Sequence, residues 1–315
     1  MNFTIGCGNS SYNTFLLQDL AVVKTYSSAL LVIFCAANIV SAICSTFGNA
    51  LVLITVWIFS ELHISSNIVL ASLAAANFFE GLTVHCLCAV GAISVVRDDC
   101  PLSRVSYVIA HFLTNAFVYS AVLNLTLATF DRYIAVIHSL RYQAILPQQR
   151  IVKLIIAVWM SSLLLSAPFL IDDPVIDDRS QNVLSATFFV ALAAIFYFNF
   201  KIYRLSRRIR RQVHLQQQAM LQLAVDNQQG HRFRGPKTMF FIFITLVICF
   251  VPALIARLSN VSSDGTRIKV SFIRPWSTFF FGLYCSISPF VYFFRCRDLR
   301  KYTRKLFCRV LSCDR

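Results

Sequence analysis

The chain has 315 residues, of which 57% are hydrophobic and 14% charged, and its mean hydropathy is +0.65. This apolar share exceeds the roughly 45 to 50% of soluble domains, so the composition excludes a soluble protein and predicts a membrane protein. The net charge of +15 raises nucleic-acid binding as an alternative, but the basic residues are dispersed among long apolar segments, which argues against it.

Seven apolar segments are long enough to cross a bilayer as helices, which takes about 20 residues each. We expect helices at about 29–59, 65–95, 104–137, 148–170, 183–208, 233–259 and 271–294. The second joins two uncharged runs that only Glu80 separates. Because lipid cannot satisfy backbone polar groups and the runs lack the alternation of a membrane barrel, the sequence predicts an all-α membrane protein, a seven-transmembrane helix bundle.

The basic residues predict the orientation of this bundle. With the tail at 1–27 outside the cell and the bundle at 28–294, the cytoplasmic segments carry 21 of the 29 Lys and Arg residues. This distribution satisfies the positive-inside rule. Three N-glycosylation motifs, at Asn2, Asn9 and Asn260, then all fall outside.

Residues 295–315 are expected to form a short interfacial eighth helix and a cytoplasmic tail. Basic residues surround an apolar stripe at helical spacing, which is typical of a helix lying on membrane lipids; the stripe is Leu299, Tyr302, Leu306 and Val310. Cys308 and Cys313 follow as candidate palmitoylation sites, with free or buried thiols as the alternative.

Two of the 11 cysteines, Cys7 and Cys100, are placed on the oxidising side of the membrane. They form the one plausible disulfide, although both can also be free thiols. The sequence shows no nucleotide-binding loop, group of metal ligands or hydrolase triad, and the loops leave no room for a catalytic domain. We therefore expect neither an enzyme nor a cofactor.

Six short motifs follow one another along the apolar segments: Gly48-Asn49, Ser72 to Asn77, Asp131-Arg132-Tyr133, Trp159, Cys249 to Pro252, and Ser288 to Tyr292. Their order resembles that of the rhodopsin-like family of G-protein-coupled receptors. Each motif alone is weak, but six in the right order and in the right helices make a chance match improbable.

The resemblance implies a plasma-membrane receptor that senses an extracellular ligand and activates heterotrimeric G proteins, with arrestin as a further partner. In this family the sixth helix swings outward and the motif arginine enters the opened cavity. Arg132 matches that arginine, Asp131 its resting restraint, and Leu140 the apolar residue that inserts into the G protein. The implied switch set is Asp131, Arg132, Tyr133, Leu140, Phe250, Pro252, Ser288, Pro289 and Tyr292. Taken alone, Asp131-Arg132 would be an interfacial ion pair.

Departures from the family pattern predict altered switching. The positions of the usual sodium site hold Asn77, Ala121 and Ser288, so the resemblance implies a degenerate site and no sodium brake. Arg232 stands where an acid often restrains the motif arginine. Two missing restraints, each worth about a kcal/mol or more of population shift, lead us to expect raised ligand-independent activity. Poor signalling is the alternative.

The ligand is constrained mainly by exclusion. Residues 275–294 contain no lysine for retinal, and Thr114 stands where amine receptors use an aspartate. Tyr107 replaces the family's disulfide cysteine, a feature that resembles the branch of melanocortin, cannabinoid and adenosine receptors. Melanocortin receptors have acids where this chain has Leu87, Tyr107 and His111, which argues against a melanocortin ligand. A lipid, a peptide and a small molecule all stay open.

The resemblance also implies a ligand cavity, lined by Glu80, Thr114, Asn115, Val118, Leu254, Arg257, Arg274 and Thr278. A carboxylate at mid-membrane costs about 2.5 to 3.5 kcal/mol, so Glu80 is a functional candidate by default. Its alternative is a protonated acid hydrogen-bonded to a neighbour such as Thr114. Arg257 and Arg274 suit an anionic or lipid ligand, or simply pair with the acidic loop at 172–178.

Two other classes of protein compete with a coupled receptor. A channel or transporter should show several charges or broken helices near mid-membrane, whereas Glu80 is the only such charge and no internal repeat is visible. A seven-helix decoy or chaperone would keep the fold without coupling. The intact Asp131-Arg132-Tyr133 motif argues against it. Three departures from the family pattern argue mildly for it: Phe250, Ser288, and Asn199 in place of the family's tyrosine.

Overall fold

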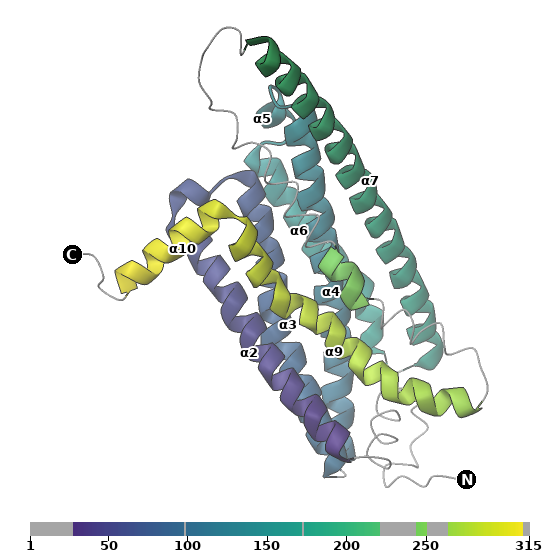
Figure 1. The fold of residues 1–315 in the computed structure, drawn as a ribbon. Coiled ribbons are helices and arrows are strands. Elements are labelled where there is room, and N and C mark those ends of the chain that lie inside the picture. The colour runs from purple at the N-terminus through teal and green to yellow at the C-terminus, as the bar shows by residue number, and fades with distance from the viewer. Residues whose placement is uncertain (1–27, 98, 172, 221–243, 251–263, 311–315) are drawn as a thin grey trace.

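The computed structural model describes residues 28–97, 99–171, 173–220, 244–250 and 264–310, and the statements below concern these residues (Figure 1). Their elements, in chain order, are α2 (Ser28–Ile58), η1 (Ser60–Leu62), α3 (Ser65–Val96), α4 (Cys100–Ile137), α5 (Tyr142–Ile145), α6 (Gln148–Ser166), η2 (Ala167–Leu170), α7 (Pro174–Met220), α9 (Asp264–Arg295) and α10 (Arg297–Val310). Residues 244–250 form a further helical segment.

Five of these helices are long and apolar enough to cross a membrane: Ala29–Ile58, Ser65–Val96, Pro101–Ile137, Gln148–Leu170 and Arg179–Ile209. A shorter apolar stretch, Gly282–Phe294, lies in α9, which begins at Asp264 rather than at residue 271. Most of the expected sixth helix lies outside the described residues. α7 continues from the membrane to Met220, because the Arg- and Gln-rich segment after residue 201 is made of good helix formers.

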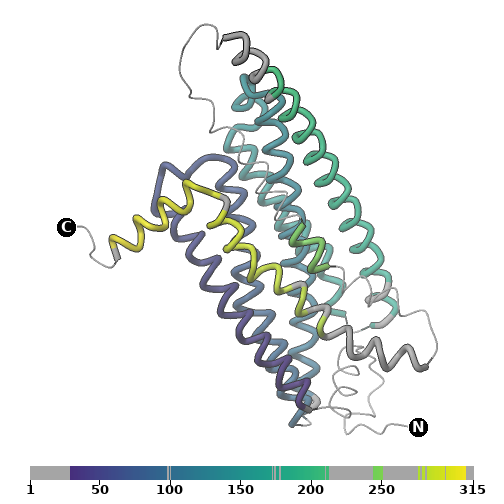
Figure 2. Tube along the Cα trace, viewed as in Figure 1, coloured from purple at the N-terminus to yellow at the C-terminus, as the bar shows by residue number. Residues whose placement is uncertain are grey.

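The helices pack in one bundle whose centre is α3. α2 and α4 flank α3, α9 lies against α2 and α3, and α7 lies against α4 (Figure 1). α10 leaves the inner end of α9 at a steep angle, as Figure 2 shows. It packs on α2, where Thr55 Oγ1 lies 3.1 Å from Thr303 Oγ1 and the rings of Phe59 and Tyr302 are 4.9 Å apart.

Two helix starts follow the same local rule. Asp99 accepts a hydrogen bond from the backbone N–H of Leu102 at 3.2 Å, and Pro101 occupies the first turn of α4. Asp173 accepts from Val175 N at 2.8 Å, directly after Pro174 opens α7. An aspartate cap and a proline in the first turn satisfy or remove backbone donors that have no partner in the helix.

Glycines allow α2 to approach both α3 and α9 closely. A Cβ on Gly81 of α3 would lie 2.6 Å from Ser45 Cβ, and one on Gly48 would lie 2.8 Å from Pro289 Cγ. Small residues at helix interfaces let backbones pack tightly in membranes, where packing replaces the hydrophobic effect as the driving force. The close contacts of α2 therefore depend on glycine at positions 48 and 81, where any side chain would collide with the neighbouring helix.

Replacing Gly81 with alanine should destabilise the protein, whereas the same change at Gly91 on the same helix should not. A Cβ on Gly91 meets nothing closer than Ser106 Cβ at 3.7 Å, an ordinary contact. Both changes gain the same helix propensity, so their difference isolates the overpacking cost of about 1 to 3 kcal/mol. Thermal unfolding of the two purified variants measures this difference. Equal melting temperatures would contradict the close approach of α2 and α3.

Candidate functional site

The inner end of α4 carries the Asp-Arg-Tyr motif, and its aspartate is buried against the following loop. Asp131 is 1% exposed and accepts a hydrogen bond from the Tyr142 hydroxyl at 2.5 Å. Ser65 at the start of α3 hydrogen-bonds the same phenol. Burial and the bond to Asp131 raise the pKa of Tyr142 to about 12, so this phenol remains a donor at physiological pH. Tyr142 thus joins the loop helix α5 to α3 and α4.

The expected pairing of Asp131 with Arg132 is not what the structure shows. No N–O distance of 4 Å or less joins these two side chains in the described part of the chain, and the buried Nε of Arg132 has no hydrogen-bond partner there. Consecutive residues on a helix point in directions about 100° apart, so a direct pair is hard to form. The restraint on Asp131 is Tyr142, which sequence reasoning missed although it lies within the same motif region.

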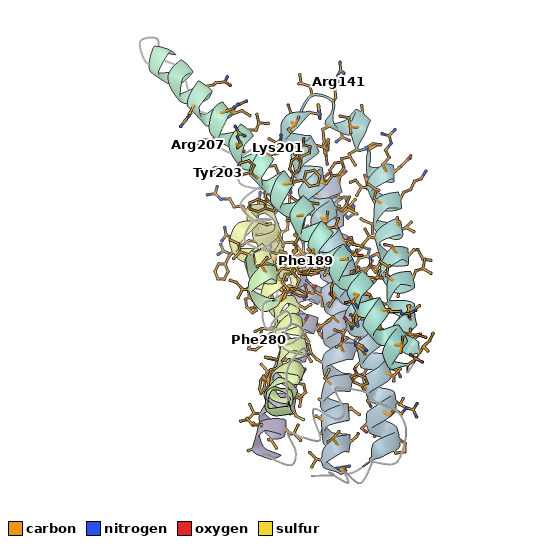
Figure 3. All side chains as sticks on the ribbon, turned by 90° about the vertical axis from the view of Figure 1, so that its right-hand side faces the viewer. Arg141, Phe189, Lys201, Tyr203, Arg207 and Phe280 are labelled. Atoms are coloured by element: carbon orange, nitrogen blue, oxygen red, sulfur yellow. The ribbon has the colours of Figure 1, made fainter. Side chains whose placement is uncertain are left out.

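The end of the bundle that carries the Asp-Arg-Tyr motif combines one exposed apolar side chain with basic side chains. Leu140 is 100% exposed at the end of the loop between α4 and α6. Figure 3 places Arg141 at the tip of that loop, and Lys201 and Arg207 on α7 towards the same end of the molecule. This end therefore offers an apolar anchor among cations.

Aromatic contacts connect the switch positions to α7. The ring of Tyr133 lies 5.1 Å from that of Phe198, between ring centroids. Phe250 stacks on Phe188 at 3.8 Å with an angle of 23° between the planes. Asn199, where the family has a tyrosine, instead donates to the Ile195 carbonyl of its own helix at 2.8 Å. The link from α7 to α4 is thus a ring contact and not a phenol hydrogen bond.

Pro289 creates a carbonyl that α2 satisfies. Proline has no N–H, so the Cys285 carbonyl four residues earlier loses its partner within α9. Asn49 Nδ2 donates to this Cys285 oxygen at 3.1 Å and to Ser45 O at 2.8 Å. The buried Asn49 side chain therefore ties the kink of α9 to α2. Tyr292, one turn further, is 0% exposed.

The three positions expected to form a degenerate sodium site are buried, and none of them is a carboxylate. Asn77, Ala121 and Ser288 are all buried. The Ser288 hydroxyl donates to the Tyr284 carbonyl of its own helix at 2.7 Å, and the Asn77 amide makes no hydrogen bond to a described residue. Ser45 Oγ donates to the Asn77 backbone oxygen at 2.8 Å. Neutral amides and hydroxyls replace the anion that would attract a cation.

The nearest buried acid, Glu80, is paired with a histidine and not with Thr114. Glu80 Oε2 lies 3.7 Å from His85 Nε2, and the Cys285 thiol hydrogen-bonds the Glu80 side chain. Thr114 instead donates to the Ala110 carbonyl at 2.7 Å, because a threonine on a helix readily bonds one turn back. The hypothesis of a Glu80–Thr114 hydrogen bond was wrong.

A chain of polar side chains extends from His85 across three helices. His85 Nδ1 lies 2.8 Å from Asn38 Oδ1, and Ser41 Oγ lies 2.9 Å from His85 Nε2 and 2.6 Å from Ser286 Oγ. Sequence reasoning gave His85 no functional role. The spacing of Asn38, Ser41, Ser45 and Asn49 along one face of an apolar helix was the available signal.

The outer end of α4 is joined to the second outer loop by noncovalent contacts. Tyr107 stacks on His111 with centroids 5.4 Å apart, and His111 packs on Phe169 of η2 at 4.8 Å. Gln181 Nε2 of α7 donates to His111 Nε2 at 3.0 Å. These contacts occupy the place where the family has a disulfide. The expected cavity residue Asn115 donates to the His111 carbonyl at 2.8 Å, and Val118 is buried.

Several predicted site residues lie outside the part of the chain that the structure describes. They are Asn2, Cys7, Pro252, Leu254, Arg257, Asn260 and Cys313. The side chains of Cys100, Arg274 and Thr278 also lie outside it, although their backbones are helical. Asn9 is likewise outside, while Cys308 is exposed on α10.

Apolar spans, buried polar links between them and an Asp-Arg-Tyr motif at the inner end of α4 together define a transmembrane receptor. Residues 48–292 match the family described as 7 transmembrane receptor (rhodopsin family), and the chain belongs to this family. The all-α seven-transmembrane bundle and the resemblance to rhodopsin-like receptors are thereby confirmed.

The relatives are receptors named for different ligands. Melanocortin receptor 3 of Rattus norvegicus is 22% identical over 287 residues, which cover 88% of this chain and 84% of that receptor. Melatonin receptor type 1A of Mus musculus is 25% identical over 236 residues, 70% of this chain and 64% of that receptor. Trace amine-associated receptor 6 of Rattus norvegicus is 36% identical over 122 residues, 38% and 34% of the two chains. Together they identify a receptor without singling out a ligand.

Replacing Asn49 with alanine should destabilise the receptor more than the same change at Asn199. Without Asn49, the Cys285 carbonyl that Pro289 leaves free is buried and unpaired, at a cost of about 1 to 3 kcal/mol. Asn199 bonds only the Ile195 carbonyl, which belongs to the regular ladder of α7. Thermal unfolding and surface expression compare the two variants. A smaller effect at Asn49 than at Asn199 would contradict its role at the kink.

Proposed function

We propose that this receptor senses an extracellular ligand and activates heterotrimeric G proteins through its cytoplasmic end, and that it has raised ligand-independent activity. The observation that carries the proposal is the family match over residues 48–292, which includes every switch motif on the described helices. The exposed Leu140 beside basic side chains provides the docking face, and arrestin is a second candidate for it. Plasma-membrane insertion with the N-terminus outside belongs to the same proposal.

The basal activity follows from restraints that differ from the family pattern. Asn77, Ala121 and Ser288 contribute no negative charge to the former sodium site, so sodium should not hold the resting state. Arg132 lacks an ion-pair partner among the described residues and has one fewer contact to break on activation. What holds the inner end in this structure is the hydrogen bond between Tyr142 and Asp131.

The ligand cavity is proposed to be the outer half of the bundle, around Thr114, Asn115 and Val118 of α4. Thr114 and Asn115 each donate one side-chain hydrogen bond to their own helix, which leaves an oxygen on each to accept from a ligand. The same proposal includes Arg257 and Arg274 as candidate contacts for an anionic ligand, because the sequence places them near the expected outer rim.

Ligand-free activation of G-protein sensors should be measurable for the wild type and abolished by Arg132→Ala. An N-terminal tag normalises both signals to the amount at the cell surface. The loss is expected because alanine removes the only guanidinium of the Asp-Arg-Tyr motif. Silence of the wild type at good surface expression would remove the claim of basal activity and favour the decoy or an obligatory agonist.

Replacing Tyr142 with phenylalanine should raise the ligand-free signal about fivefold. The change deletes the donor to Asp131, and a hydrogen bond worth about 1 kcal/mol shifts a two-state equilibrium by about that factor. Tyr203→Phe is the matched control, because that phenol is 62% exposed on α7 (Figure 3). The same signal from both variants would show that Tyr142 does not restrain the resting state.

A further inference from the structure

A carboxyl group and an imidazole lie buried together where α3 meets α9. Glu80 and His85 are each 2% exposed. Gly282 of α9 provides the space for both, because a Cβ there would lie 2.5 Å from His85 Cε1 and 2.7 Å from Glu80 Oε1. α9 therefore keeps Glu80 and His85 buried only while it holds this position against α3.

The hydrogen bonds around His85 can adapt to a proton at one nitrogen. Asn38 uses its amide N–H on the Phe34 carbonyl at 2.9 Å, so its oxygen accepts from His85 Nδ1. Nε2 is thus the nitrogen that can gain or lose a proton. When Nε2 is bare, Ser41 donates to it; when Nε2 is protonated, it donates to Ser41, which donates to Ser286, which donates to the Ser41 carbonyl at 3.0 Å.

The charge balance of the pair favours one bound proton. A carboxylate beside a neutral imidazole buries one uncompensated charge, and so does a carboxylic acid beside an imidazolium. Either neutral arrangement, acid with imidazole or carboxylate with imidazolium, avoids this cost. Glu80 Oε2 has no hydrogen-bond partner among the described residues, and His85 is the one described ion-pair partner of Glu80.

Other titratable groups near the pair are thiols. Cys285 of α9 hydrogen-bonds Glu80, Cys88 lies on α3, and Cys35 of α2 lies near Cys88. Among the described side chains, α2, α4 and α9 place no lysine or arginine within 4 Å of the Glu80 carboxyl group. Among the described side chains, Glu80 and His85 are therefore the acid and the base that meet at this place.

We propose that Glu80 and His85 form a proton-binding site that holds one proton in the resting receptor, and that displacement of α9 hydrates the pair and changes the number of bound protons. This inference rests on the proposed signalling function. In water, glutamate and histidine titrate near about 4.3 and 6.5, so above pH about 6.5 the hydrated pair binds no proton. The active state then releases one proton, and alkaline pH favours it by up to about tenfold per pH unit.

Ligand-free G-protein activation in membranes, measured from about pH 5.5 to 8, tests the site. The wild-type signal should be flat below pH about 6.5 and rise two- to tenfold per unit above it. E80Q should be flat above pH about 6.5, because it removes the carboxyl group of the pair and with it the site that holds the proton. H85Q should rise across the whole range, because Glu80 alone is protonated when buried and ionised when hydrated.

The double variant E80Q/H85Q supplies the background response of the G protein itself to pH. Equal pH dependence in the wild type and E80Q would overturn the proposal. If E80Q does not reach the surface, the comparison of wild type with H85Q below pH about 6.5 still decides, because only H85Q should respond there. Equal slopes in that range would also overturn it.

Thermal unfolding of the purified receptor separates this inference from the proposed function, because it needs neither ligand nor G protein. Above pH about 6.5 the folded pair holds one proton and the unfolded pair none, so stability should fall as pH rises. The melting temperature should fall more steeply for the wild type and H85Q than for E80Q. A silent signalling assay with this thermal pattern would leave the site standing and remove the signalling claim. Parallel curves would remove the site.

Discussion

The constraint that governs this molecule is that its spans have no water to hydrogen-bond, so each buried polar group must find a partner within the protein. The chain meets it in two ways. Thr114, Ser288 and Asn199 turn back to the carbonyl one turn earlier on their own helix. Asn49 and Ser41 instead reach another helix. The first way is local and leaves neighbouring helices free, whereas the second fixes their relative positions.

Cross-helix hydrogen bonds connect α2, α3 and α9, whereas α7 combines ring contacts with a hydrogen bond. The Phe188–Phe250 and Tyr133–Phe198 contacts are not directional, while Gln181 of α7 donates a hydrogen bond to His111 of α4. Ring stacks tolerate small rotations that would break a hydrogen bond. The ring contacts of α7 therefore suit the movement that the proposed activation needs.

The apolar segments and motif order were enough to predict the fold class and family, because span length and helix kinks are properties of local sequence. Pro289, for example, identifies a kink by itself. The partners of buried groups were beyond reach, because periodicity says that a side chain points inward and not which helix it meets. Glu80 was recognised, but His85 was not assigned to it, and Tyr142 was overlooked because a loop tyrosine has no pattern that distinguishes it from a surface residue.

The noncovalent contacts at the outer end of α4 differ mechanically from a disulfide. A disulfide between α4 and the loop would open only through redox chemistry, but the Tyr107–His111–Phe169 stack and the Gln181 hydrogen bond are weak contacts that thermal motion breaks and remakes. These contacts can therefore open and reclose without any redox step. Under the proposed function, a ligand that enters at this end would meet them first, and these four side chains would then affect the rate of ligand capture more than the final fit.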